Sequence, residues 1–488
     1  MRARLSEDTT RLNGGRVLLG GSPLTLMRLS AAGAAVVDRL TDRSFVRLDQ
    51  PAAESRLLGR LVDAGIVDVS LDPESETNVA RRCTVVIPCH NDADGLAATL
   101  ASCGPINLVV VDDASVDGDG IRTVVDQHNA QCAADGQQLA RLVRLDVNGG
   151  PAAARNEGAE LATTDVIVFI DAGVTWSEAW MATALAWFDD ERCAVAAPRV
   201  CSTPGPSRLE RYERDRSPLD LGSRGGPVGP GRRVAYVPSA TLMVRRAAFV
   251  RSGGFDPTMR FGEDVDLVWR LIGQPSQNND SNYSGPDKNF SCRYLGDEAV
   301  VEHRPRPSLA HAVRQRFGYG TAAGPLDRRH RGHVAPMSAS KWSVAVTGSL
   351  VAGHPLVALV VSLGNAEALA RKIAPLDNAR RESARLVARG HLGATQQLLR
   401  AMIRPWWPIT AMAAACSRRG RRLALVAAVV PPMIEWNRRR PELDPATWLA
   451  LSLADDLSYS AGVWVGCWRE HSIRALLPRF SEWPGAKN

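Results

Sequence analysis

Several acidic side chains of this protein follow short apolar runs, at points from which a carboxylate can bind a cation or accept a proton. Asp112 and Asp113 follow the run 108–111, and Asp171 follows the run 165–170. Carboxylate oxygens are ligands that hard cations such as Mg²⁺ prefer, and a carboxylate near a substrate hydroxyl can act as a general base. Carboxylates at neighbouring strand ends would bring such chemistry together in one crevice.

A third acidic group, Glu263, Asp264 and Asp266, stands where a helix is predicted to begin. Negative side chains favour the first turn of a helix because of its dipole, and this explains at least one of the three without any function. A carboxylate aimed at a bound acceptor can also remove the proton from its hydroxyl group. Both interpretations remain open at this stage.

The elements that must position the first carboxylates have the pattern of buried parallel strands. The runs 84–87 and 108–111 are short and apolar, and the first leads into Pro88, His90 and Asn91. Ligands of open α/β sheets bind outside the carboxyl ends of such strands, and a nucleotide would fit there. Simple capping of the following helix explains one acidic strand end equally well, but the recurrence after the run 165–170 favours a site.

A glycine-containing turn follows the next predicted strand, 139–145. The segment Asn148 to Gly158 combines this turn with the start of a helix, whose N-terminal amides can face a phosphate group. Arg155 lies on this helix. An arginine on a helix surface is unremarkable by itself, so its role depends on the pattern around it.

These stretches together resemble the family 2 glycosyltransferases over roughly residues 80–320. The family's motifs P-x-x-N, V-D-D-x-S and A-R-N-x-G have counterparts at the strand ends and on the glycine-rich helix. The most specific match is G-G-F-D at 253–256, followed by G-E-D-x-D-L-x-x-R at 262–270. The resemblance implies an α/β fold of the GT-A type, with a Rossmann-like mixed sheet that binds a nucleotide sugar, and inverting transfer of the sugar.

The resemblance also implies roles for individual residues. Asp264 corresponds to the catalytic base, and Glu263 stands beside it as the second catalytic candidate. Contacts to the nucleotide sugar fall on the strand ends and the glycine-rich helix, at Pro88, His90, Asn91, Asp113, Arg155 and Asp171.

The predicted metal site departs from the family pattern. Relatives carry D-x-D where this chain has Asp171-Ala172-Gly173, so one carboxylate ligand is missing. Asp171 and His303 are the remaining candidates for binding Mn²⁺ or Mg²⁺, although a lone histidine is as often structural. A hard cation can retain water and bind the phosphates themselves, so we expect a divalent metal at a site weakened by Gly173.

The chain divides into three predicted regions: a small module (1–78), the catalytic domain (79–334) and a helical, arginine-rich region (335–488). The stretch 58–67 resembles the winged-helix-like peptide-binding modules of modified-peptide pathways. A small domain that only packs on the catalytic one is the alternative. Strands at 16–19 and 45–48, helices at 27–40 and 53–64, a linker at 71–80, a mobile loop at 204–233 and a polar surface loop at 273–291 are also predicted.

The last region contains two apolar stretches. Val344 to Leu363 has about the length that spans a bilayer, but a buried hairpin of helices is nearly as good an interpretation. Leu423 to Ile434 is too short to span and is flanked by arginines, as expected of a segment on anionic lipid.

Charge and cysteine usage limit the partners and the compartment. The net charge is +7, which suits anionic sugar nucleotides or phospholipid headgroups; no nucleic-acid partner is expected, although charge alone does not decide this. The 9 cysteines show neither C-x-x-C pairs nor zinc-type spacing, which favours a reducing cytosol. With no apolar signal segment at the start, we expect a protein of the cytoplasm or of the cytoplasmic face of the membrane.

The order of the three regions resembles glycosyltransferases that act on peptide-derived redox cofactors. This implies transfer of glucose from UDP-glucose, or a similar donor, to a peptide-derived acceptor. A polysaccharide or lipid-linked sugar transferase is the alternative among enzymes. A nucleotide-sugar-binding protein without turnover is the alternative outside them, because Gly173 removes a carboxylate.

Overall fold

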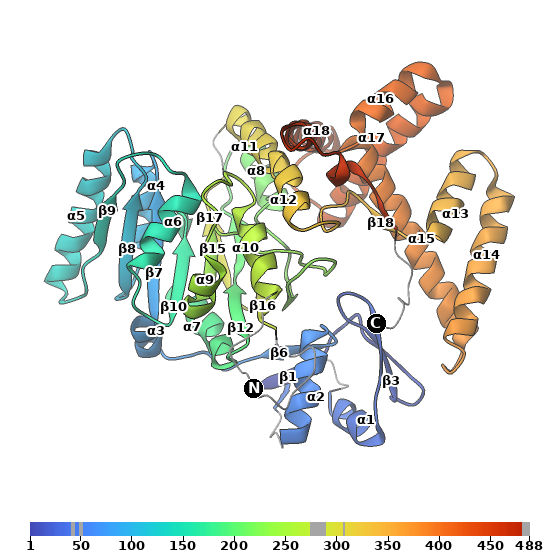
Figure 1. Ribbon diagram of the computed structural model, residues 1–488, viewed down its shortest axis with the longest axis horizontal. Helices are drawn as coiled ribbons and strands as arrows, with labels where there is room; N and C mark the ends of the chain where they lie inside the picture. Colours follow the sequence, from blue (N-terminus) through green and yellow to red (C-terminus); the bar gives the residue numbers. More distant parts are fainter. Residues whose placement is uncertain (41–43, 48–51, 274–288, 306–307, 481–488) are drawn as a thin grey trace.

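The computed structural model describes the 488 residues except 41–43, 48–51, 274–288, 306–307 and 481–488. Figure 1 shows an α/β domain on the left, the N-terminal module below it in blue, and the C-terminal helices on the right in orange and red.

An eight-stranded mixed sheet forms the centre of the α/β domain, in the order β14-β16-β12-β15-β10-β7-β8-β9. The strands β10, β7, β8 and β9 are parallel, and β15 runs antiparallel between β10 and β12. The predicted strands at 84–87, 108–111 and 165–170 are confirmed. The bounds are β7 Cys83–Cys89, β8 Asn107–Asp112, β9 Arg141–Arg144, β10 Val166–Ile170, β12 Cys193–Ala197, β14 Arg224–Pro227, β15 Thr241–Arg245 and β16 Ser291–Gly296.

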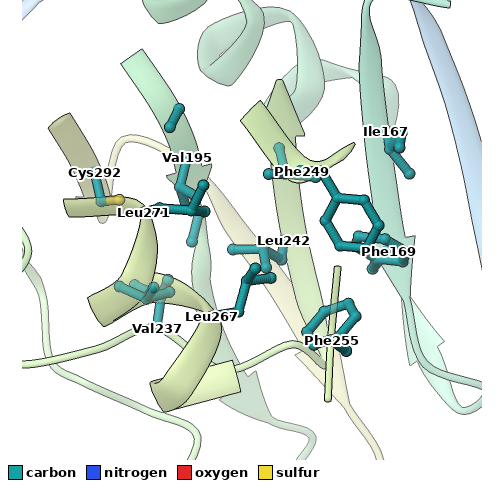
Figure 2. Packing of buried hydrophobic residues seen from close by; sticks show 14 of the residues in the cluster. Ile167, Phe169, Val195, Val237, Leu242, Phe249, Phe255, Leu267, Leu271 and Cys292 are labelled. Carbon is teal, nitrogen blue, oxygen red and sulfur yellow. The ribbon is translucent and has the colours of Figure 1, made fainter. Parts of the chain in front are cut away.

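Both faces of this sheet are covered, which explains why the central strands β10 and β12 are apolar throughout. In β10, Val168 packs into the core on one face, whereas Ile167 and Phe169 pack into the core on the other. Figure 2 shows Phe169 beside Phe249 and Phe255, and the Phe169 and Phe255 rings are 5.1 Å apart. The helices of the domain are α3 Glu76–Arg82, α4 Ala93–Ala101, α5 Gly118–Ala134, α6 Pro151–Glu160, α7 Glu178–Leu185, η1 Ala186–Asp189, α9 Arg246–Ser252 and α10 Glu263–Ile272.

A second small sheet joins β11 (Val174–Thr175), β17 (Val300–His303) and β13 (Arg199–Ser202). In this sheet Val174 pairs with His303, so the residues after Asp171 lie beside the strand that ends in His303.

The segment 204–233 is not the unstructured loop that its Arg, Gly and Pro content suggested. It contains α8 (Arg208–Arg216) and the strand β14. A capping box starts α8, because Ser207 accepts from the amide of Glu210 and Glu210 accepts from the amide of Ser207. The sequence pattern S-x-x-E at 207–210 therefore indicated the start of this helix. The polar insertion predicted at 273–291 lies mostly outside the described residues.

The N-terminal module has its own core and contacts both other regions. The Asp63 carboxylate pairs with Arg192 and Arg293 of the catalytic domain, and Val17 packs against Leu369 and Val387 of the C-terminal helices. The module therefore contacts the catalytic domain on one side and the C-terminal helices on another. The linker predicted at 71–80 contains part of α3. The bounds are β1 Arg2–Leu5, β2 Thr10–Leu12, β3 Val17–Gly20, β4 Thr25–Arg28, α1 Ala31–Asp38, β5 Val46–Arg47, α2 Ala52–Asp63 and β6 Val67–Ser70.

Of the helices after the catalytic sheet, α11 and α18 pack closely on each other. Gly320 and Gly462 allow two backbones to touch: a Cβ atom on Gly320 would lie 2.0 Å from the Tyr459 carbonyl oxygen. The bounds are α11 Leu309–Thr321, α12 Ala323–Arg329, β18 Ser338–Ala339, α13 Lys341–Val351, α14 Pro355–Lys372, α15 Ala379–Ile403, α16 Trp407–Cys416, α17 Arg418–Arg439, α18 Pro445–Arg469, η3 Arg474–Leu476 and β19 Arg479–Phe480.

The stretch 344–363 is divided between α13 and α14, which form a hairpin. Within the described residues, no helix is long and apolar enough to cross a membrane. The hairpin alternative is thus confirmed, but its burial is not, because many of its apolar side chains are exposed. The other apolar stretch, 423–434, lies inside α17.

Candidate active site

A cavity of about 980 Å³ lies between the catalytic sheet and the C-terminal helices. The first turn of α10 forms one wall, and α11, α12 and α18 contribute the opposite one. None of the described lining residues comes from 1–78. The lining residues that can carry charge or stack are Arg155, Asp171, Tyr236, Arg260, Glu263, Asp264, Trp269, His303, Tyr319, His333, Arg404, Asp455 and Tyr459.

Arg155 links the end of β10 to the start of α10. It is 3% exposed and donates from Nη1 to Glu263 (3.0 Å) and from Nη2 to Asp171 (2.6 Å). Burial would lower the pKa of Arg155, but Asp171 and Glu263 outweigh this and raise it. The structure therefore brings three predicted site residues together, with the guanidinium between two carboxylates.

Glu263 and Asp264 face the cavity from the start of α10. Burial raises the pKa of Glu263, and the neighbouring Asp264 charge raises it further, to about 7, although Arg155 opposes both effects. Burial also raises the pKa of Asp264, against hydrogen bonds from the amides of Val265 (2.8 Å) and Ser239 (3.2 Å). Glu263 is buried and bound to Arg155, whereas Asp264 is half-buried. Asp264 is thus the more accessible of the two carboxylates.

Asp266 occupies the other side of the same turn and is fully buried. His330, Arg270 and Arg329 surround its carboxylate, with His330 Nε2 at 2.9 Å and Arg270 Nε at 2.7 Å. Burial alone would raise the pKa of Asp266, but hydrogen bonds from His330 and Arg270 lower it to about 2. Asp266 does not line the cavity, so it holds α10 against α12.

The predicted residues at the ends of β7 and β8 form a separate cluster. His90 Nδ1 is 2.7 Å from the Asp113 carbonyl oxygen, and Asn91 accepts from the amide of Val116. Both carboxylate oxygens of Asp113 accept backbone amides, from Gly149 and Gly150. Asp113 therefore shapes the turn before α6.

This cluster, together with Pro88, is not part of the cavity lining. Asn148 connects the two groups, because it contacts the His90 ring and accepts from Arg260 of the cavity wall at 3.4 Å. The predicted site residues thus fall into two neighbouring groups.

Asp171 and His303 line the same cavity, but they do not form a closed metal site. No group of three or more His, Cys, Asp and Glu side chains in the described part of the chain is arranged to hold a metal. One oxygen of Asp171 already accepts from Arg155. The donor set therefore fits a cation that takes most of its ligands from water and substrate phosphates, and does not fit one held by protein alone.

Sequence reasoning missed the cavity residues from outside the recognised motifs. Tyr236 and Arg260 flank the motifs, whereas Arg404, Asp455 and Tyr459 lie on the C-terminal side. The Arg404 guanidinium stacks over the Tyr459 ring at 4.2 Å. No local pattern marks these C-terminal residues, because their place depends on how α11 and α18 pack.

A mixed sheet with acidic strand ends, facing a helix that begins with two cavity carboxylates, defines a glycosyltransferase of the GT-A type. A family model described as Glycosyl transferase family 2 matches residues 84–250. The chain is 35% identical over 484 residues to "Pre-mycofactocin glycosyltransferase" of Mycobacterium tuberculosis (strain ATCC 25618 / H37Rv), covering 96% of this chain and 95% of that protein. The protein therefore belongs to glycosyltransferase family 2, and the predicted family and enzyme class are confirmed.

Two further similarities extend over less of the chain and have lower sequence identity. "Succinoglycan biosynthesis protein ExoU" of Rhizobium meliloti (strain 1021) is 26% identical over 200 residues, which are 38% of this chain and 56% of that protein. The solved structure of a mannosyltransferase from Pyrobaculum calidifontis, in complex with GDP-Man and Mn²⁺, is 18% identical with a TM-score of 0.37; the match covers 68% of this chain and 90% of that one.

Proposed function

We propose that this glycosyltransferase transfers glucose from UDP-glucose, or a closely similar nucleoside diphosphate hexose, to a peptide-derived redox cofactor precursor in mycofactocin biosynthesis. The acceptor rests on the similarity to the pre-mycofactocin enzyme, which extends through all three regions of the chain. The chemistry rests on one observation: Asp264 stands half-buried in the cavity wall at the start of α10.

In the proposed reaction Asp264 accepts the proton of an acceptor hydroxyl. The hydroxyl oxygen forms a bond to the anomeric carbon while the bond from that carbon to the diphosphate oxygen breaks. The nucleoside diphosphate leaves with that electron pair. Attack on the face opposite the diphosphate inverts the anomeric centre.

Hydrogen bonds and a neighbouring ion pair fix the position of the Asp264 carboxylate for this step. Amides of Ser239 and Val265 each donate to a different oxygen of its carboxylate, which orients the group and favours its ionised form. Arg155 holds Glu263 and Asp171, so the second carboxylate of the pair is fixed beside the base. We assign Glu263 a positioning role for this reason.

We infer that Asp171 and His303 hold a Mn²⁺ or Mg²⁺ ion together with the donor diphosphate. Such an ion would neutralise the charge that develops on the leaving diphosphate. Arg260 lines the same cavity and supplies positive charge from the protein itself.

The test is a donor panel scored for nucleoside diphosphate release, with and without the peptide-derived acceptor. We expect UDP-glucose to be used fastest, release to accelerate with the acceptor, and the new glycosidic bond to have the inverted configuration by NMR. A retained configuration would refute the proposed mechanism. Transfer only to a polysaccharide or a lipid-linked sugar would refute the acceptor while leaving the mechanism intact.

A further inference from the structure

The hairpin of α13 and α14 has an apolar outer face, and α13 turns polar side chains toward the protein. On α13, Ser343 Oγ lies 2.9 Å from His391 of α15, and Thr347 Oγ1 lies 3.3 Å from Thr395. A helix on a water-facing surface shows the opposite arrangement, with its apolar stripe toward the core. The outer face of the hairpin is therefore suited to an apolar environment.

The second helix also exposes an apolar face, although its buried residues Ala358, Leu369 and Ala370 are apolar as well. Its outward residues Leu356, Val360 and Leu363 are 77%, 67% and 61% exposed, and they recur at the spacing of one helix face. The small residue Ala358 is buried on the other side. Apolar residues of this size, exposed together on neighbouring turns, mark a surface that something else covers.

The exposed hydroxyl groups of the hairpin are already satisfied. Ser349 donates to the Ala345 carbonyl oxygen, and Ser362 donates to that of Ala358, each at 2.8 Å. Transfer of these hydroxyl groups out of water would cost little free energy, because their hydrogen bonds to the helix backbone are kept.

Charge at the base of the hairpin indicates which apolar environment covers it. The sequence from Trp342 to Ala366 contains no Asp, Glu, Lys or Arg, whereas Lys341 begins α13 and Arg371 and Lys372 end α14. Glu367 pairs with Arg371, so the base of the hairpin keeps a net positive charge. Basic side chains at the edge of an apolar face match the anionic headgroups at the edge of a bilayer's hydrocarbon.

The composition of the face also favours lipid over a second protein. Its exposed centre on α14 consists of Leu and Val, whereas the centres of protein interfaces are enriched in aromatic residues and Arg. Trp342 stands at the basic end of the hairpin, where interfacial tryptophans of membrane-bound segments are found.

We propose that the hairpin 341–372 docks by its outer face into one leaflet of an anionic membrane. It lies in the interface and does not span, so that Leu356, Val360 and Leu363 enter the acyl region while Lys341, Arg371 and Lys372 remain among the headgroups. This surface is separate from the catalytic cavity, to which the described residues of the hairpin contribute no lining.

The test uses the full chain in flotation with vesicles of phosphatidylcholine, with and without phosphatidylglycerol. We expect the protein to float with the phosphatidylglycerol vesicles and to remain bound in part at about 1 M salt, because apolar contact survives screening. Leu356→Asp and Val360→Asp should each weaken vesicle binding by about tenfold or more. Val250→Asp is the matched control, since Val250 is 63% exposed on α9, and it should bind as the unmodified protein does.

Unchanged nucleoside diphosphate release by all three variants in solution would show that they are folded. Failure of the unmodified protein to float, complete release by salt, or equal binding of all variants would each overturn the proposal. A stable dimer in lipid-free solution that Leu356→Asp dissociates would also overturn it, because the face would then cover a second copy of the chain.

Discussion

The two sides of the first turn of α10 carry the same kind of side chain in opposite electrostatic surroundings. On the cavity side, burial raises the pKa values of Glu263 and Asp264. On the other side, Asp266 is more deeply buried, yet His330, Arg270 and Arg329 surround it and lower its pKa to about 2. The helix dipole acts on all three carboxylates, so the difference comes from the neighbours that the tertiary structure supplies.

This difference separates a carboxylate suited to proton transfer from one suited to holding the fold. A base needs a pKa near the working pH and access to the substrate, whereas a structural carboxylate needs permanent charge and cationic partners. Asp264 lines the cavity and has a raised pKa, whereas Asp266 has a lowered pKa and the cationic partners Arg270 and Arg329. Substitutions at Asp264, Glu263 and Asp266 change one side of the turn at a time.

The largest effect is expected at Asp264. Asp264→Asn keeps the size of the side chain but cannot accept the proton, so kcat should fall by roughly 10²- to 10⁴-fold, the range of a lost general base. The donor dissociation constant, measured by calorimetry, should stay close to that of the unmodified protein.

Glu263→Gln is the matched control on the same turn, and its kcat should fall less. If Asp264→Asn retains near-normal turnover, or if donor binding collapses with it, Asp264 is not the base and the role moves to Glu263.

A change at Asp266 should affect stability instead. Asp266→Asn leaves the cations around it without their anion in a buried site, which costs roughly 3–5 kcal/mol of unfolding free energy. Chemical denaturation monitored by circular dichroism measures this cost. The kcat per folded molecule at low temperature should stay within a few-fold of that of the unmodified protein. A 10²-fold loss of kcat would mean that Asp266 also acts in catalysis.

The sequence was sufficient for the parts of this site that depend on local pattern. Apolar runs ending in Asp112 and Asp171 located the strands β8 and β10, and the acidic start of α10 was placed at Glu263. Without the family resemblance, local pattern could not separate Asp264 from Asp266, because Arg329 and His330, two of the partners of Asp266, lie more than sixty residues later.

The cavity wall formed by α11 and α18 could not be predicted from the sequence either, because it also depends on contacts between segments far apart in the chain. Tyr459 reaches the cavity only because Gly320 and Gly462 allow α11 and α18 to touch. Two glycines so far apart give no local signal. Hydropathy located the stretch 344–363 but could not tell that its two helices present their apolar side outward.

A third test adds a carboxylate two residues after Asp171. Gly173 has φ of +88°, and a Cβ there would meet only Asp92 Oδ2, at 4.0 Å, so the site has room for a side chain but strains its backbone. Gly173→Asp should lower the Mn²⁺ concentration for half-maximal activity by about tenfold, because it supplies the missing ligand. Gly173→Asn bears a similar backbone strain without the charge and is the control. Activity indifferent to chelator in all three proteins would exclude a metal requirement.

The smallest expected effect is a shift in pH dependence, and it tests the two sides with opposite signs. Folding raises the pKa of Glu263 from 4.5 to about 7, so this group contributes stability below pH 4.5 that is lost as the pH rises through about 7. Folding lowers the pKa of Asp266 from 3.8 to about 2, so its contribution is present above pH 3.8 and is lost as the pH falls through about 2.

The difference in unfolding free energy between the unmodified protein and Glu263→Gln should therefore shrink as the pH rises from about 4.5 to about 7. The difference from Asp266→Asn should shrink as the pH falls below about 4. In kcat/KM, the acidic pair should produce a rise with pH that lies above the usual carboxylate range, because burial raises both pKa values and the two carboxylates titrate together. Removing one negative neighbour should move that rise to lower pH in Glu263→Gln and leave it unmoved in Asp266→Asn. An equal shift of the kcat/KM profile in both variants would mean that the charge of Asp266 also affects the pKa values of the cavity carboxylates. The two sides of the turn would then not be electrostatically separate.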